Sequence, residues 1–125
     1  MSVKVGREPE VSHDEHAEAA VLGCVFIEPA VLGEVRSALR GGEFWRKKHR
    51  VIFEAICEVA DRGDEPDLLT VYDCLKAHGR VETAGGAAYV TSLPNLVPHS
   101  AGAMQWAYIL LRYSAKRVKL ELAAA

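Results

Sequence analysis

The sequence predicts an all-α fold, and three observations lead to this expectation. Apolar residues recur at helical spacing in each long segment, most densely over residues 46–62. Helix-capping residues precede these segments, and glycine or proline follows them. No alternating pattern is long enough for a strand, since residues 87–91 are few and rich in alanine. We therefore expect a small six-helix bundle that ends in a long C-terminal helix.

The composition indicates one globular domain. With 125 residues, of which 50% are hydrophobic and 26% charged, the chain can bury a single core. The formal net charge of −2 argues against a domain that mainly grips phosphates, because such domains are usually basic. No apolar run reaches the ~18 residues of a membrane span, and the polar N-terminus lacks the apolar segment of a secretory signal. We expect a cytoplasmic protein that contacts no membrane.

The N-terminal part divides into a tail and a first helix. Residues 1–11 are charged, contain Gly6 and Pro9 and show no periodicity, so we expect a flexible tail. The bundle is expected to span residues 12–98. Its first helix should begin at Ser12, which forms an S-x-x-E capping box with Glu15.

Small and rigid residues shape the next segments. Gly23 lies inside the first helix, where glycine costs ~1 kcal/mol relative to alanine, so we expect a neighbouring element to approach closely there. Pro29 should end this helix and start the second, at about residues 30–39. Two glycines at 41 and 42 then separate it from residues 46–62.

Residues 46–62 are predicted to form the central helix of the bundle. Apolar residues would cover most of the circumference of this helix: they are Val51, Ile52, Phe53, Ala55, Ile56, Cys57, Val59 and Ala60. A helix of this kind must be covered on several sides. Gly63 supplies the expected stop.

The following helices are shorter. Asp67 is the expected N-cap of a helix over residues 68–77, which Gly79 ends. A fifth helix is expected at about residues 87–93, before a rigid loop over residues 94–98.

The C-terminal helix, expected within residues 99–125 and starting at about residue 101, carries two apolar seams. One contains Met104, Ala107, Leu111, Val118 and Leu122, and the other contains Trp106, Leu110, Tyr113 and Leu120. Two seams indicate two partners: the bundle itself and a second polypeptide. Because large aromatic residues and arginine often anchor protein interfaces, the predicted partner-binding residues are Trp106, Leu110, Tyr113 and Arg117.

The sequence gives no catalytic, cofactor-binding or metal-binding residue. The phosphate-binding pattern G-x-x-x-x-G-K-[ST] is absent, which excludes ATP hydrolysis by that route within these residues. His13 and His16 have no convincing third ligand. The three cysteines (Cys24, Cys57 and Cys74) form no C-x-x-C pair and are expected to be buried, reduced thiols.

The best basic patch is the run 46–50, Arg-Lys-Lys-His-Arg. A solvated face, an acidic protein partner and nucleic acid all fit this run. His49, within it, faces the apolar side one turn before Ile52, so we interpret it as a histidine at the edge of the core.

Several motifs follow one another in a fixed order. They are the run 18–23 (EAAVLG), Phe44 with His49-x-x-Ile52-Phe53, Gly63, Pro66-Asp67, Thr70-Val71, Leu75, Gly79, Gly85-Gly86-x-x-Tyr89 and Leu93. Over about residues 15–120 this order resembles the N-terminal domain of bacterial replicative DNA helicases of the DnaB type. The chain departs from the family at Ala101-Gly102, where an Ala-Asn pair is usual.

The resemblance implies a function. It implies a bundle followed by a helical hairpin, whose first arm corresponds to residues 101–122. Hairpins in the family pair between subunits, help six subunits to form a ring, and contact primase. ATP, Mg²⁺ and most DNA contacts belong to a separate C-terminal ATPase domain, so the chain would be a non-catalytic fragment of an ATP-dependent DNA helicase or an unusually short natural protein. In isolation it would be a monomer or a dimer.

Two other classes of function remain open from the residues alone. One is a standalone DNA-binding or regulatory helical domain that uses the basic run 46–50. The other is an enzyme that depends on a thiol or a metal ion.

Overall fold

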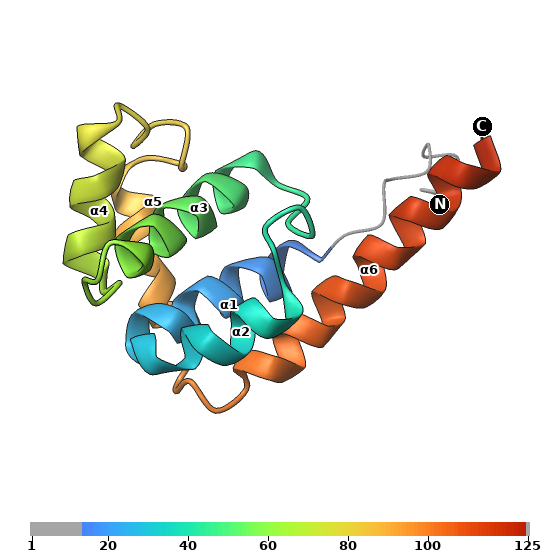
Figure 1. The fold of residues 1–125 in the computed structure, drawn as a ribbon, viewed down its shortest axis with the longest axis horizontal. Helices are drawn as coiled ribbons and strands as arrows, with labels where there is room; N and C mark the ends of the chain where they lie inside the picture. The colour runs from blue at the N-terminus through green and yellow to red at the C-terminus, as the bar shows by residue number, and fades with distance from the viewer. Residues whose placement is uncertain (1–13, 125) are drawn as a thin grey trace, which may run out of the picture.

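The computed structural model describes residues 14–124, which form six α-helices and two short 3₁₀ helices (Figure 1). In chain order they are α1 (Glu15–Ile27), η1 (Pro29–Val31), α2 (Leu32–Ala38), α3 (Lys47–Asp61), α4 (Leu68–Ala77), α5 (Ala87–Ser92), η2 (Leu93–Leu96) and α6 (Ala103–Ala124). No strand occurs among these residues, so the all-α prediction is confirmed. The predicted tail over residues 1–11 lies outside the described part of the chain.

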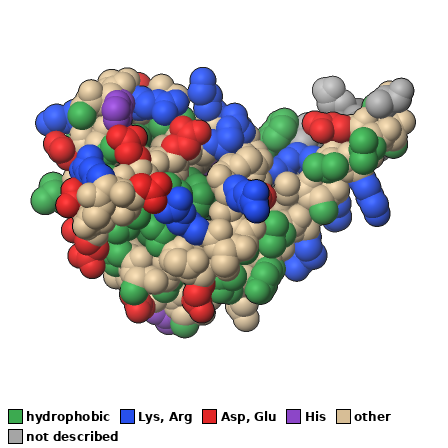
Figure 2. Space-filling view, viewed as in Figure 1, with side chains coloured by type: hydrophobic (Ala, Val, Ile, Leu, Met, Phe, Trp, Pro, Cys, Tyr) green, Lys and Arg blue, Asp and Glu red, His purple; other side chains and the backbone are tan. Residues whose placement is uncertain are grey.

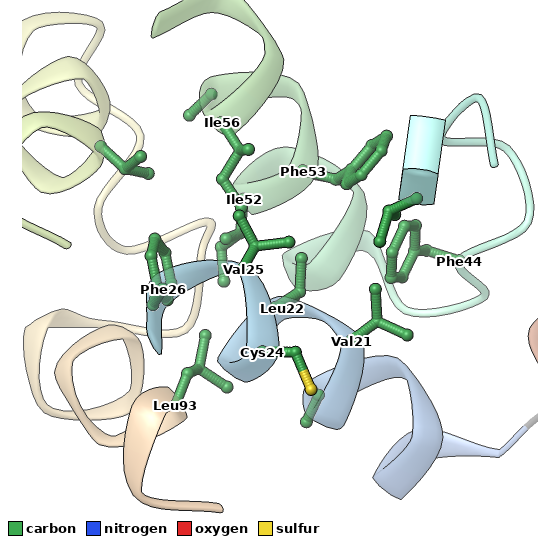
Figure 3. Packing of buried hydrophobic residues seen from close by; sticks show 14 of the residues in the cluster. Val21, Leu22, Cys24, Val25, Phe26, Phe44, Ile52, Phe53, Ile56 and Leu93 are labelled. Atoms are coloured by element: carbon green, nitrogen blue, oxygen red, sulfur yellow. The ribbon is translucent and has the colours of Figure 1, made fainter. Parts of the chain in front are cut away.

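The helix at the centre of the bundle is α1, and the prediction that residues 46–62 hold this place is wrong. Every residue from Ala17 to Phe26 is buried, because α3, α6, η1 and η2 all pack against α1. Helix α3 instead keeps an exposed polar stripe that includes Glu54, Glu58 and Asp61. Figure 3 shows the side chains of the two helices meeting, with Leu22 and Val25 of α1 facing Ile52 and Phe53 of α3.

Most helix ends follow local sequence signals. Asp67 caps α4 by accepting a hydrogen bond from the backbone N–H of Thr70 at 2.9 Å. Gly63 and Gly79 follow α3 and α4 with φ of +94° and +65°, in the left-handed conformation that glycine adopts without strain. These three predictions are confirmed.

Other boundaries differ from expectation. The side chain of Asp14 caps α1 by accepting a hydrogen bond from the N–H of Ala17 at 3.0 Å, and Ser12 lies outside the described residues. The second helix is shorter than predicted, because η1 takes up the residues after Glu28. The expected loop after residue 93 begins as η2, and α6 begins at Ala103. Such differences of one or two residues are usual at helix ends.

Gly23 allows the close packing of α1 on η2. A Cβ atom at this position would collide with the backbone carbonyl of Leu93. The predicted close approach is therefore confirmed, and the neighbour is the backbone of η2. Leu93 is itself fully buried against α1 (Figure 3).

A buried carboxylate joins α1 to the start of α3. Glu18 is fully buried and accepts hydrogen bonds from the backbone N–H groups of Trp45 at 2.5 Å and Arg46 at 3.2 Å. The N-cap residue of α3, Arg46, makes no side-chain cap of its own. Glu18 therefore supplies both the missing acceptor and the negative charge that the N-terminus of a helix favours.

His49 extends this polar network to α5. It is fully buried, with Nδ1 at 2.7 Å from Oε1 of Glu18 and Nε2 at 2.6 Å from the hydroxyl of Tyr89. Burial raises the pKa of Tyr89 to about 12, with the nearby Glu15 and Glu18 carboxylates adding to the effect, so its hydroxyl remains a donor. The ring of His49 thus bridges the Glu18 carboxylate and the Tyr89 hydroxyl through its two nitrogen atoms. His49 is therefore a fully buried structural residue.

We predict that Glu18→Ala lowers the free energy of unfolding by about 3 kcal/mol or more. The substitution leaves the N–H groups of Trp45 and Arg46 and the ring of His49 without their acceptor inside the protein. The matched control is Glu15→Ala on the same helix, which removes only exposed ion pairs and should cost about 1 kcal/mol or less. Urea denaturation measures both, and equal losses would contradict the structural role of Glu18.

We also predict opposite effects for two glycine-to-alanine substitutions in helices. Gly23→Ala should destabilise by about 1–3 kcal/mol, because the new methyl group meets the carbonyl of Leu93. Gly33→Ala in α2, where nothing lies within 4 Å of the added Cβ, should stabilise by about 0.5–1 kcal/mol. Thermal unfolding distinguishes the two, and a stabilising Gly23→Ala would contradict the close approach.

Candidate functional site

The last helix, α6, packs on the bundle as far as Arg117. It contacts α1 and α2, and its remaining residues project from the bundle into solvent (Figure 1). Residues 118–124 are all exposed. Within residues 14–124 no helix combines the length and apolarity required to cross a lipid bilayer.

The four predicted partner-binding residues lie in different environments. Leu110 is only 1% exposed and belongs to the core, so the prediction that it faces outward is wrong. Trp106 is half-buried, and its ring lies edge-on to His16 with centroids 5.4 Å apart. These two residues pack α6 against the bundle, whereas Leu120 of the same predicted seam is 57% exposed.

The other two predicted residues lie further along α6. Tyr113 is half-buried, with the Lys116 ammonium 5.0 Å from its ring centroid. Arg117 donates a hydrogen bond to the carbonyl of Glu43 at 2.7 Å and lies over the ring of Trp45. Arg117 thus ties α6 to the segment between α2 and α3. A role for Trp106, Tyr113 and Arg117 in binding a partner stays a prediction.

The surplus apolar surface belongs to a different face, which we call the α6 seam. It consists of Tyr108, Leu111, Ala115, Val118 and Leu122. The spacings of three and four residues alternate, as in one strand of a coiled coil. Tyr108, Val118 and Leu122 are 53%, 51% and 72% exposed, and Figure 2 shows hydrophobic side chains along the projecting helix. The sequence analysis placed three of these residues in one seam and missed Tyr108 and Ala115, which the alternating spacing could have added.

Basic side chains flank the α6 seam. Arg112, Lys116 and Lys119 are all exposed and lie along one side of the helix at four-residue and three-residue intervals. Figure 2 shows lysine and arginine side chains beside the hydrophobic ones on this helix. A helix that covered the seam would therefore meet a positive edge.

The basic run 46–50 does not form an open cationic patch. Arg46 and Lys48 both lie within 4 Å of the Glu15 carboxylate, at 3.1 and 3.5 Å. Arg50 donates to the backbone carbonyls of Phe44 and Trp45. Most of the cations in the run are thus engaged within the chain, which reduces the support for nucleic-acid binding.

The cysteines are not activated nucleophiles. Burial raises the pKa of the thiols of Cys24, Cys57 and Cys74, which disfavours the nucleophilic thiolate form. Cys24 and Cys74 are buried as predicted, and Cys57 is half-buried. Cys74 lies close to His78 of the same helix end and to Glu58 of α3, a cluster that sequence reasoning missed. The signal available in the sequence was the four-residue spacing of Cys74 and His78.

Comparison with known proteins gives consistent results. Residues 10–112 match the family described as the DnaB-like helicase N-terminal domain. The chain is 41% identical to the replicative DNA helicase DnaB of Geobacillus stearothermophilus over 101 residues, which cover 81% of this chain and 22% of that protein. It is 32% identical to the corresponding helicase of Treponema pallidum over 111 residues, covering 89% and 25%. The chain thus spans about a quarter of the length of these relatives.

A solved structure confirms the fold. The crystal structure of the N-terminal domain of DnaB helicase from Mycobacterium tuberculosis superimposes with a TM-score of 0.88 at 30% sequence identity. The match covers 92% of this chain and 82% of that one. The buried network explains the sequence motifs, because Glu18, His49 and Tyr89 each come from a different motif and meet in the core. The chain belongs to the DnaB-like helicase N-terminal domain family.

Proposed function

We propose that this chain is a non-catalytic domain that assembles a replicative DNA helicase in the cytoplasm and docks its replication partners. Subunits of the full-length protein would form a ring of six, and primase would bind at the same helical region. The observation that carries the proposal is the α6 seam on a helix that projects from the bundle.

The α6 seam suits a partner helix. Its alternating three- and four-residue spacing provides the side-chain rows that pack into the gaps of a second helix. Val118 and Leu122 are more than half exposed. Covering them would stabilise a complex by ~25 cal/mol for each Å² of apolar surface removed from water. Part of this gain offsets the entropy lost on association. The second arm of a helical hairpin is the occupant that the family resemblance supports.

The charges beside the seam favour a partner with acidic residues. Arg112 and Lys119 occupy the positions next to the seam from which coiled-coil residues form ion pairs with the opposing helix. Such pairs direct the choice and orientation of a partner more than they increase affinity. A primase surface or hairpin arm that carries aspartate or glutamate along its edge would fit this face.

ATP and Mg²⁺ would bind in a separate motor domain of the parent protein, which would also make most of the DNA contacts. The named relatives are helicases about four times as long as the matched region, since the match covers 22–25% of each. The residues of this chain would contribute assembly and docking to that helicase.

We predict that Val118→Asp combined with Leu122→Asp raises the dissociation constant for self-association or for primase at least about tenfold. The two carboxylates place charge in the apolar seam without disturbing the core, because both side chains are exposed. Sedimentation velocity measures self-association, and titration with primase from the same organism measures docking. The far-ultraviolet circular dichroism spectrum should be unchanged.

The control is Leu69→Asp, which adds one of these charges on α4 at a side chain that is 77% exposed and outside the seam. This control should leave both measurements unchanged. If the seam variant behaves like the control, or if the wild-type chain neither self-associates nor binds primase, the docking role is wrong. Salt-dependent binding of DNA that is lost on neutralising Lys47 would instead support a DNA-binding domain.

We predict a different result for Leu110→Ala. This side chain is 1% exposed, so its truncation should lower the free energy of unfolding by about 2–5 kcal/mol. Urea denaturation measures the loss. At a temperature where the variant remains folded, primase affinity should stay within about twofold of wild type if Leu110 serves the core alone. A stable variant with weak primase binding would show that Leu110 itself forms the docking surface.

A further inference from the structure

A cluster of three metal-ligating side chains lies between α3 and α4, on the side of the molecule away from α6 (Figure 1). Glu58 comes from α3, Cys74 from the last turn of α4, and His78 is the residue that ends α4. One ligand atom of each lies within 4.8 Å of the others. We propose that these three residues form a binding site for one divalent transition-metal ion of the Zn²⁺ class, with water as the fourth ligand.

The backbone fixes two of the three ligands. Cys74 and His78 are four residues apart at the end of a helix, so their side chains lie on the same face one turn apart. Gly79 follows with φ of +65°, and the backbone N–H of Arg80 donates a hydrogen bond to the carbonyl of Leu75 at 2.8 Å. This tight helix stop holds the end of α4 in a defined conformation beside α3.

Only small side-chain movements separate the observed cluster from a coordination shell. Nε2 of His78 lies 2.9 Å from Oε2 of Glu58, in a hydrogen bond. Tetrahedral zinc with bonds of about 2.0–2.3 Å places neighbouring ligand atoms roughly 3.4–3.6 Å apart. One observed separation is 2.9 Å and none exceeds 4.8 Å, so rotation of the two exposed side chains would bring all three atoms around one ion.

The surroundings provide an opening for an ion. A cavity of about 70 Å³ is lined by all three ligands together with Arg80. The side chains of Glu58 and His78 are about half exposed, while Cys74 is 2% exposed at the inner end. The guanidinium of Arg80 pairs with the carboxylate of Glu54 at 3.2 Å, which offsets part of its positive charge. A hydrated ion can therefore enter from solvent and meet the sulfur last.

The ligand set selects the class of ion. One thiolate, one imidazole and one carboxylate suit borderline-soft ions such as Zn²⁺ and Co²⁺, whereas Mg²⁺ and Ca²⁺ prefer oxygen ligands alone. Three protein ligands leave the fourth position open to water. Burial raises the pKa of the Cys74 thiol, but the positive charge of a coordinated metal ion favours the thiolate and releases the proton.

The binding step is balanced by loss of a proton. The S–H bond of Cys74 breaks, its proton passes to solvent, and a sulfur–metal bond forms. Nε2 of His78 donates its proton to the hydrogen bond with the Glu58 carboxylate, so this N–H bond must also break. The proton leaves Nε2 to solvent while solvent protonates Nδ1, and the lone pair freed at Nε2 coordinates the metal with no net change in the protons of the ring. The ion then bridges α3 and α4. Because it binds only the folded arrangement, it stabilises the folded state by mass action.

Titration of the reduced protein with Co²⁺, without oxygen, tests the proposal. We expect one equivalent to bind with a sulfur-to-cobalt charge-transfer band in the near ultraviolet, and one equivalent of Zn²⁺ to displace it. Cys74→Ala should abolish the band. His78→Ala should weaken metal binding at least about tenfold. The variant should remain folded, because the His78 side chain is about half exposed. Zn²⁺ should raise the melting temperature of the wild type and not that of either variant.

Matched controls make the result specific to the cluster. Cys57→Ala removes a thiol on α3 outside the cluster, and His99→Ala removes an exposed imidazole from the loop before α6. Both should bind Co²⁺ like the wild type. The proposal is overturned if no charge-transfer band appears at a few equivalents of Co²⁺, if Cys74→Ala or His78→Ala binds as tightly as the wild type, or if the Cys57 variant loses the band.

Discussion

The carboxylate of Glu18 is the interaction on which the arrangement of this domain depends. Burying a charge is costly unless hydrogen bonds replace the lost water. Glu18 accepts hydrogen bonds from two backbone N–H groups at the start of α3 and is hydrogen-bonded to the ring of His49. The other ring nitrogen of His49 is hydrogen-bonded to the hydroxyl of Tyr89. One residue of α1 therefore links the start of α3 to α5, because this arrangement gives Glu18 and His49 their hydrogen-bond partners.

The position of α1 determines what α6 can present. Buried residues continue around α1 from Ala17 to Phe26, and α6 covers one of its sides with Ala107 and Leu110. The contacts of Arg117 with Glu43 and Trp45 then hold the next part of α6 against the segment before α3. The part of α6 after Arg117 therefore projects as a helix that is already formed, which reduces the entropy cost of pairing with another helix.

The metal-ligating cluster and the α6 seam lie at different ends of the molecule (Figure 1). Only the α3 and α4 pair contributes to the cluster, and neither helix carries part of the seam. An ion at the cluster would strengthen the α3–α4 contact without touching the docking helix. The two properties can therefore be varied independently by substitution.

The sequence by itself determined the local features of this protein. Asp67 as the cap of α4, Gly63 and Gly79 as helix stops, and the all-α class follow from interactions within a few residues, which a sequence displays directly. The ordered motifs also identified the family, because residues that meet in the core, such as Glu18 and His49, must occur together in the chain.

Only the tertiary structure decided which apolar surfaces were covered. α1 and α3 are both rich in apolar residues, and periodicity does not reveal that α1 is surrounded while α3 keeps a polar face. Likewise, the sequence pointed to Leu110 rather than Val118 as a partner-binding residue, yet the packing of α6 buries Leu110 and leaves Val118 exposed. Glu58 and Cys74 become neighbours only when α3 and α4 fold back on each other. Burial depends on the placement of distant segments, and spacing within one segment does not encode it.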